Sequence, residues 1–140
     1  MKVTIEPSVA RGNIVAPPSK SMAHRMLLGA GLSCGTSTVH NIELSEDIKS
    51  TLDILKSLGA EYFIEDNVVT MQGIGGRRVQ AFDRLNCRES GSTLRFFLPV
   101  VLTGGEEYEF YGADRLFERP LDIYEDICKA QGIEFTKSKT

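Results

Sequence analysis

Apolar residues fall along the chain in two kinds of run, short runs that predict strands and longer runs at helical spacing. In the first half, one helix is predicted from about Ser21 to Leu32, and Ser45 precedes a second that ends before Gly59. Strands are predicted at residues 3–6, 12–15, 37–42, 60–64 and 67–71. The last two should form a hairpin across Glu65-Asp66. This alternation of helices and strands indicates an α/β fold.

The second half of the chain predicts the same kinds of element. One helix should open at Glu89 and run to about Leu102, and another should begin at Arg119-Pro120 and end before Gly132. Pro99 lies inside the first of these helices and predicts a kink or a break. Strands are predicted at residues 85–87, 107–111 and 133–135.

The two halves match each other in order, which predicts an internal repeat. Ser19 and Ser90 are 71 residues apart, and Lys56 and Lys129, each before a Leu-Gly-Ala-Glu-like segment, are 73 apart. The alternative is two generic α/β units without a common origin. Because the second unit has no residues left for its closing pair of strands, we expect the 140 residues to be the front piece of a longer protein.

The amino-acid composition argues against several classes of function. With a net charge of −3, no broad nucleic-acid-binding surface is expected. No apolar run is long enough to span a membrane, and the N-terminus lacks the apolar stretch of a signal peptide, so a cytoplasmic location is expected. Three widely spaced cysteines and two histidines predict neither a disulfide framework nor a metal centre.

The candidate chemistry begins at the first helix, after Pro17-Pro18. A Ser cap leaves backbone N–H groups free at a helix start, and Lys20, Ser21 and Arg25 surround them with hydroxyl and positive charge. Ser21 and Arg25 are four residues apart and therefore share a helix face. The pattern predicts an anion site, most simply for phosphate. The alternative is an ordinary Ser cap with two solvated basic residues.

The second half repeats this pattern at Ser90-Gly91-Ser92, with Arg95 one turn later and Arg119 at a third predicted helix start. Gly91 would let a ligand approach the backbone. If the helix starts converge, they would hold a multiply anionic small molecule. For Arg119 a surface ion pair with Glu118 or Asp122 is the alternative, and for Arg95 packing within the domain.

Asp47 is a candidate acid, because it also lies at a predicted helix start. The alternative role is a carboxylate that interacts favourably with the helix dipole. No second carboxylate, Ser-His-Asp set or Cys-His pair accompanies it, so the sequence predicts anion binding without a convincing acid–base pair.

Three ordered segments resemble the EPSP synthase (3-phosphoshikimate 1-carboxyvinyltransferase) family. They are Pro18-Ser19-Lys20-Ser21-Met22-Ala23-His24-Arg25, Cys87 to Phe96, and Gly112 to Leu121 with its Glu118-Arg119-Pro120. The resemblance implies repeated βαβαββ units in an inside-out α/β barrel, with about two of the three units of one domain present. Residues 1–13 would pack with the second domain of the full-length family. Residues 14–140 would form an incomplete substrate-binding domain, with unit one at about 14–76 and a truncated unit two at about 77–140.

The resemblance also implies a reaction, the transfer of the enolpyruvyl group of phosphoenolpyruvate to the 5-hydroxyl of shikimate 3-phosphate with release of phosphate. No metal or organic cofactor is implied. Ser21 and Arg25 would hold shikimate 3-phosphate, and Lys20, Gly91 and Arg119 would hold phosphoenolpyruvate. Lys20 would also be catalytic, as would Asp47.

Further expectations concern secondary residues and activity. Ser92 and Arg95 are secondary candidates for substrate binding, and Glu89-Ser90 stands where some family members have Asn-Ala. The family's proton-transfer carboxylates lie in the remainder of its longer chain, so the 140 residues alone are expected to be inactive without that remainder.

Two alternatives stay open. One is a UDP-N-acetylglucosamine enolpyruvyl transferase, which would have the same fold but has Lys-Asn in place of Lys20-Ser21. The other is the non-catalytic half of a split anion-binding protein.

Overall fold

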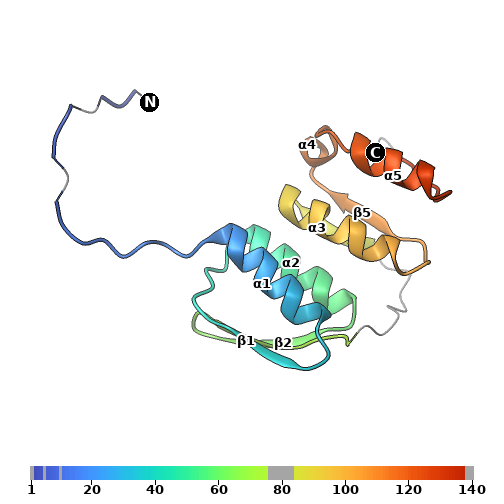
Figure 1. The fold of residues 1–140 in the computed structure, drawn as a ribbon, viewed down its shortest axis with the longest axis horizontal. Coiled ribbons are helices and arrows are strands. Elements are labelled where there is room, and N and C mark those ends of the chain that lie inside the picture. The colour runs from blue at the N-terminus through green and yellow to red at the C-terminus, as the bar shows by residue number, and fades with distance from the viewer. Residues whose placement is uncertain (1, 5, 10, 76–83, 138–140) are drawn as a thin grey trace.

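The computed structural model describes residues 2–4, 6–9, 11–75 and 84–137, which form five helices and five strands. The helices are α1 (Lys20–Leu32), α2 (Glu46–Ser57), α3 (Gly91–Leu102), α4 (Asp114–Phe117) and α5 (Asp122–Ala130). The strands are β1 (Thr36–Val39), β2 (Glu61–Glu65), β3 (Val68–Gln72), β4 (Arg84–Arg88) and β5 (Glu109–Gly112). In Figure 1, α1, α2 and α3 run side by side, with one small sheet on each side of the layer they form.

The first sheet has the order β1-β3-β2 and is antiparallel throughout. Val69 of β3 lies opposite Val39 on one side and Ile64 on the other. The predicted hairpin is confirmed, and its turn contains Asp66 at φ 53°, a conformation that Asp tolerates better than most residues. This sheet packs one face against the helices, and the buried side chains on that face are Val39, Val69 and Met71.

The second sheet is the parallel pair β4 and β5, connected by α3. Parallel neighbours need a crossover connection, so this is a βαβ unit. The core lies between the helices and both sheets, and its fully buried side chains include Leu27 of α1, Leu55 of α2, Leu94 and Phe97 of α3 and Leu85 of β4. The α/β prediction is therefore confirmed.

Three predicted strands differ from the structure. Residues 12–15 are not a strand, and Ile14 and Val15 are 93% and 97% exposed in an extended tail (Figure 1). The described residues of 3–6 form no strand either; residue 5 lies outside the described residues. Residues 133–135 follow α5 without entering a sheet. A strand needs a partner for its backbone groups, and none of the described strands pairs with these segments.

The helix predicted at Arg119-Pro120 begins later, at Asp122, and the short helix α4 before it was not predicted. Arg119 therefore lies in the turn between α4 and α5 and not at a helix start. Among the described residues, no helix is long and apolar enough to cross a membrane.

Pro99 does not break α3, which continues through it to Leu102. A proline in a helix leaves the carbonyl four residues earlier without its N–H partner, and here that carbonyl belongs to Arg95. The hydroxyl of Tyr124 in α5 donates a hydrogen bond to the Arg95 carbonyl oxygen at 3.1 Å. The neighbouring helix thus supplies the donor that Pro99 removes, and this bond fastens α5 to α3.

We predict that Tyr124→Phe lowers the free energy of unfolding by about 1 kcal/mol, because the Arg95 carbonyl loses its donor. In a Pro99→Ala background the alanine N–H can replace that donor, so the same change should cost less. Urea unfolding of the four proteins in this double-mutant cycle measures the coupling. Equal costs in the two backgrounds would show that the tyrosine does not compensate for the proline.

Candidate anion-binding site

The start of α1 forms as predicted, with Ser19 as its N-cap. The extended Pro17-Pro18 segment leads into it, and the Ser19 hydroxyl accepts a hydrogen bond from the N–H of Met22 at 3.3 Å. The N–H of Ala23 is bonded to the Ser19 carbonyl. Within the described part of the chain, no hydrogen bond is found for the N–H of Lys20 or Ser21. These two groups remain available to an anion.

Lys20 is the first residue of α1, and its side chain extends to the start of α2. Its ammonium forms an ion pair with the carboxylate of Asp47, which lies in the first turn of α2 behind the N-cap Ser45. The Lys20 side chain is 54% exposed and that of Asp47 28%, so solvent still reaches the ammonium. Asp47, predicted as an acid or a dipole-stabilising carboxylate, is also the counter-ion of the candidate lysine.

Arg25 extends from α1 over α3. It donates a hydrogen bond from Nη1 to the Ser21 carbonyl at 2.8 Å, and its Cζ lies 5.2 Å from the ring centre of Phe96. A cation over an aromatic face is attracted by the ring's negative face. The Ser21 hydroxyl and the Arg25 side chain are both exposed, as a binding role needs.

The start of α3 has two guanidinium groups beside it. Arg95 donates to the carbonyl of Gly91 at 3.4 Å and to the carbonyl of Pro120 at 3.3 Å. A Cβ atom at Gly91 would lie 3.0 Å from Nη1 of Arg95 and would overlap the guanidinium of Arg119. Glycine is therefore required at position 91 for Arg119 to lie where it does, against the first turn of α3.

The first turn of α3 also carries free backbone donors. Its N-cap, Ser90, accepts the N–H of Thr93 at 3.1 Å, and the N–H of Leu94 is bonded to the Ser90 carbonyl. For the N–H groups of Gly91 and Ser92, no hydrogen bond is found in residues 84–137 or elsewhere in the described structure. Ser92 is exposed. Two cations and two free N–H groups make this helix start suited to phosphate or carboxylate.

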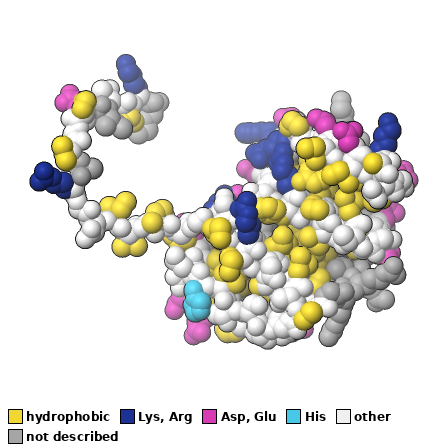
Figure 2. Space-filling model, viewed as in Figure 1, with side chains coloured by type: hydrophobic (Ala, Val, Ile, Leu, Met, Phe, Trp, Pro, Cys, Tyr) yellow, Lys and Arg dark blue, Asp and Glu magenta, His cyan; other side chains and the backbone are white. Residues whose placement is uncertain are grey.

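The starts of α1, α2 and α3 lie together, whereas the convergence considered from the sequence involved α1, α3 and a helix starting at Arg119. Lys20 joins α1 to α2, and the Thr93 hydroxyl of α3 donates to the Asp47 carbonyl at 3.3 Å. Lys and Arg side chains gather at this end of the folded part in Figure 2. Arg119 reaches the same region from the α4–α5 turn. No ion pair of Arg119 with Glu118 or Asp122 is present among the described residues.

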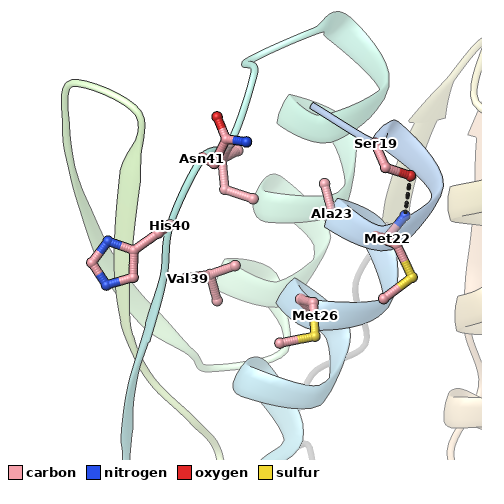
Figure 3. Close-up of a pocket in the computed structure, with 8 residues that line it drawn as sticks. Ser19, Met22, Ala23, Met26, Val39, His40 and Asn41 are labelled. Atoms are coloured by element: carbon pink, nitrogen blue, oxygen red, sulfur yellow. Dashed lines mark hydrogen bonds between the residues drawn. The ribbon is translucent and has the colours of Figure 1, made fainter. Parts of the chain in front are cut away.

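A hollow beside α1 is separate from these cations. Figure 3 shows Ala23 and Met26 of α1 on one side of it and Val39 and Asn41 on the other, with the His40 ring turned outward. Its lining is mostly apolar and includes none of the basic candidates. Within the described ranges, no group of three His, Cys, Asp or Glu side chains is placed to hold a metal ion.

His24 is the residue near this site that the sequence analysis did not single out. Its ring is 1% exposed, and its Nδ1 lies 2.8 Å from the hydroxyl oxygen of Thr51 in α2. Burial lowers the pKa of His24 from its usual 6.5; the Asp47 carboxylate acts in the opposite direction, while the charges of Lys20 and Arg25 add to the lowering. Helical spacing from Leu27, three residues later, could have placed His24 on the buried face.

Comparison with solved structures defines the class of fold. Two structures of EPSP synthase from Acinetobacter baumannii superimpose with TM-scores of 0.78 and 0.81 at 22% identity. They cover 88% and 91% of this chain, which matches 28% and 29% of theirs. The chain thus has part of the α/β fold of an enolpyruvyl transferase.

Sequence comparison gives the family. The 3-phosphoshikimate 1-carboxyvinyltransferases of Clostridium kluyveri and Clostridium novyi are 43% and 44% identical to this chain, over 95% and 97% of its length. The profile of the EPSP synthase (3-phosphoshikimate 1-carboxyvinyltransferase) family matches residues 5–139. The chain belongs to this family. It spans about a third of the length of these relatives, 31% and 33%.

We predict that the folded protein becomes less stable as the pH falls from 7.5 toward 5.5. The unfolded imidazole of His24 takes up a proton near pH 6.5, whereas the folded one, with its lowered pKa, still resists protonation there. In His24→Asn this loss should be smaller. Urea unfolding at both pH values measures it, with His40→Asn, at an exposed histidine, as the control. A loss as large in His24→Asn as in the wild type would contradict the assignment.

Proposed function

We propose that the protein to which these residues belong transfers the enolpyruvyl group of phosphoenolpyruvate to the 5-hydroxyl of shikimate 3-phosphate, releasing phosphate, and acts in the cytoplasm. The observation that carries the proposal is the placement of Arg95 and Arg119 against Gly91, at a helix start with free N–H groups. Family membership gives this anion site its chemical identity.

We assign phosphoenolpyruvate to the part of the site around Lys20, Gly91 and Arg119. Its phosphate and carboxylate are both anions, and a guanidinium can bind either with two parallel hydrogen bonds. The N–H groups of Gly91 and Ser92 add neutral donors, and Arg95 supports the backbone at Gly91 through its bond to that carbonyl. When the substrate binds, Lys20 would exchange its contact with Asp47 for one with the substrate.

Shikimate 3-phosphate is assigned to Ser21 and Arg25, which share one exposed face of α1. For Asp47 we propose an acid–base or orienting role, made possible once Lys20 turns toward the substrate. The remainder of the longer family chain is the proposed partner of this piece, and residues 1–13 would pack against it. This agrees with the exposure of Val3 and Val9, which are 67% and 80% exposed.

We predict that Arg119→Lys weakens phosphoenolpyruvate binding about tenfold, because an ammonium cannot form the two-pronged contact of a guanidinium. Arg84→Lys is the matched control. Arg84 is exposed and makes its two-pronged contact with Glu109, at 2.8 and 2.9 Å, away from Gly91. Calorimetric titration of the chain and both variants measures the affinities. Equal weakening by both substitutions would show that Arg119 has no particular place in the site.

The same titration separates the candidate functions. Binding of shikimate 3-phosphate supports the proposal, whereas preferential binding of UDP-N-acetylglucosamine would favour the other enolpyruvyl transferase. Affinity that appears only after a second polypeptide is added would indicate a split anion-binding protein.

We expect the 140 residues alone to release no phosphate from the two substrates, since the carboxylates that the family uses for proton transfer lie in the remainder of its longer chain. A coupled phosphate-release assay tests this. Turnover at the rate of a full-length relative would refute it.

A further inference from the structure

A chain of buried polar side chains connects the three helices just below the candidate site. It runs from His24 in α1 through Thr51 in α2 to Thr93 in α3 and ends at Ser90, the N-cap of α3. The three successive distances are 2.8 Å, 2.9 Å and 2.7 Å. All four side chains are at most 2% exposed. A buried polar chain constrains geometry strongly, since any member that moves leaves its neighbour unpaired.

The hydrogen bonds along this row of polar side chains must run in one direction from donor to acceptor, because each hydroxyl has only one proton to donate. The Thr93 hydroxyl faces two acceptors other than Thr51, the Asp47 carbonyl at 3.3 Å and the Ser90 oxygen at 2.7 Å, and these two share its one proton. Thr93 then accepts from Thr51, so Thr51 has no proton left for His24. Nδ1 of His24 must therefore carry the imidazole proton and donate it to Thr51.

The surroundings of Nε2, the other ring nitrogen of His24, are consistent with a proton on Nδ1. Nε2 is buried, and it is the one buried side-chain nitrogen or oxygen in the described residues for which no hydrogen-bond partner is found. With the proton on Nδ1, the unpaired group at Nε2 is a lone pair. In the reverse direction it would be a buried N–H group without an acceptor, so a proton on Nδ1 avoids one unsatisfied buried donor.

We propose that His24 is a positioning residue, which acts through Thr51 and Thr93 to fix Ser90 and so keeps the free N–H groups of Gly91 and Ser92 aligned with Lys20. In this arrangement Ser90 receives both the N–H and the O–H of Thr93, at 3.1 and 2.7 Å. These two donors hold the Ser90 oxygen, and the bonds from Thr93 to Thr51 and from Thr51 to His24 join the start of α3 to α2 and α1. The inference deepens the proposed function and rests on it for the identity of the anion.

The test compares substitutions that break the chain with substitutions that preserve it. Thr51→Val removes the central hydroxyl at constant shape, and His24→Leu removes the donor. Thr51→Ser keeps the hydroxyl, and the amide nitrogen of His24→Asn can occupy the position of Nδ1. Ile54→Val, at another fully buried position of α2, is the control for a general loss of stability.

Phosphoenolpyruvate affinity and the amide NMR shifts of Gly91 and Ser92 are measured well below each melting temperature. Thr51→Val and His24→Leu should weaken binding by roughly three- to tenfold, while the two conservative variants and Ile54→Val stay close to the wild type. Equal affinity of Thr51→Val and Ile54→Val would overturn the proposal.

A second measurement needs no ligand and no variant. The nitrogen-15 shifts of the His24 ring in the free wild-type protein report which nitrogen carries the proton, and Nδ1–H is expected. An Nε2–H tautomer would overturn the proposed direction and with it the fixing of Ser90. If the wild type binds no phosphoenolpyruvate, the proposed function fails, and the tautomer still decides whether the polar chain exists as inferred.

Discussion

Backbone N–H groups at the starts of α1 and α3 have no partner within their own helices, and the side-by-side packing of three helices brings them to one place. A helix start is polar and carries partial positive charge, so two adjacent starts with Lys20, Arg95 and Arg119 around them repel each other unless an anion or a carboxylate is present. Asp47 supplies that carboxylate in the described structure, through its ion pair with Lys20. Apolar contacts in the core hold the arrangement together against this repulsion.

Several hydrogen bonds outside the candidate anion site help to hold the helix starts together. The Tyr124 hydroxyl compensates the Arg95 carbonyl that Pro99 leaves without a partner, and Arg95 in turn bonds to the Pro120 carbonyl. These two bonds fasten the segment after α4 to α3 and so bring Arg119 against Gly91. On the other side, the His24–Thr51–Thr93–Ser90 chain fastens α3 to α1 and α2. These bonds fix the backbone segments that carry the cationic side chains, so less conformational entropy is lost when an anion binds.

The tail before α1 and the second sheet differ in how their strands are paired. β4 and β5 form a parallel pair around α3, whereas residues 12–15, predicted as a strand before α1, have no strand partner among the described residues. A strand leaves its backbone groups and apolar side chains exposed until a neighbouring strand or element covers them. The exposure of Ile14 and Val15 is consistent with a chain that spans about a third of the relatives it matches.

Local sequence determined the starts of α1, α2 and α3 and most of the elements. Ser19, Ser45 and Ser90 cap α1, α2 and α3 because a short hydroxyl side chain satisfies a first-turn N–H within three residues. The sequence also determined the family, through three ordered motifs. Tertiary structure alone decided that Lys20 meets Asp47, that α3 continues through Pro99, that Arg119 lies in a turn against Gly91, and that His24 bonds to Thr51. Each of these four contacts joins groups that are 25 or more residues apart in the sequence. The local pattern within one helical turn does not specify which distant side chain will pack against it.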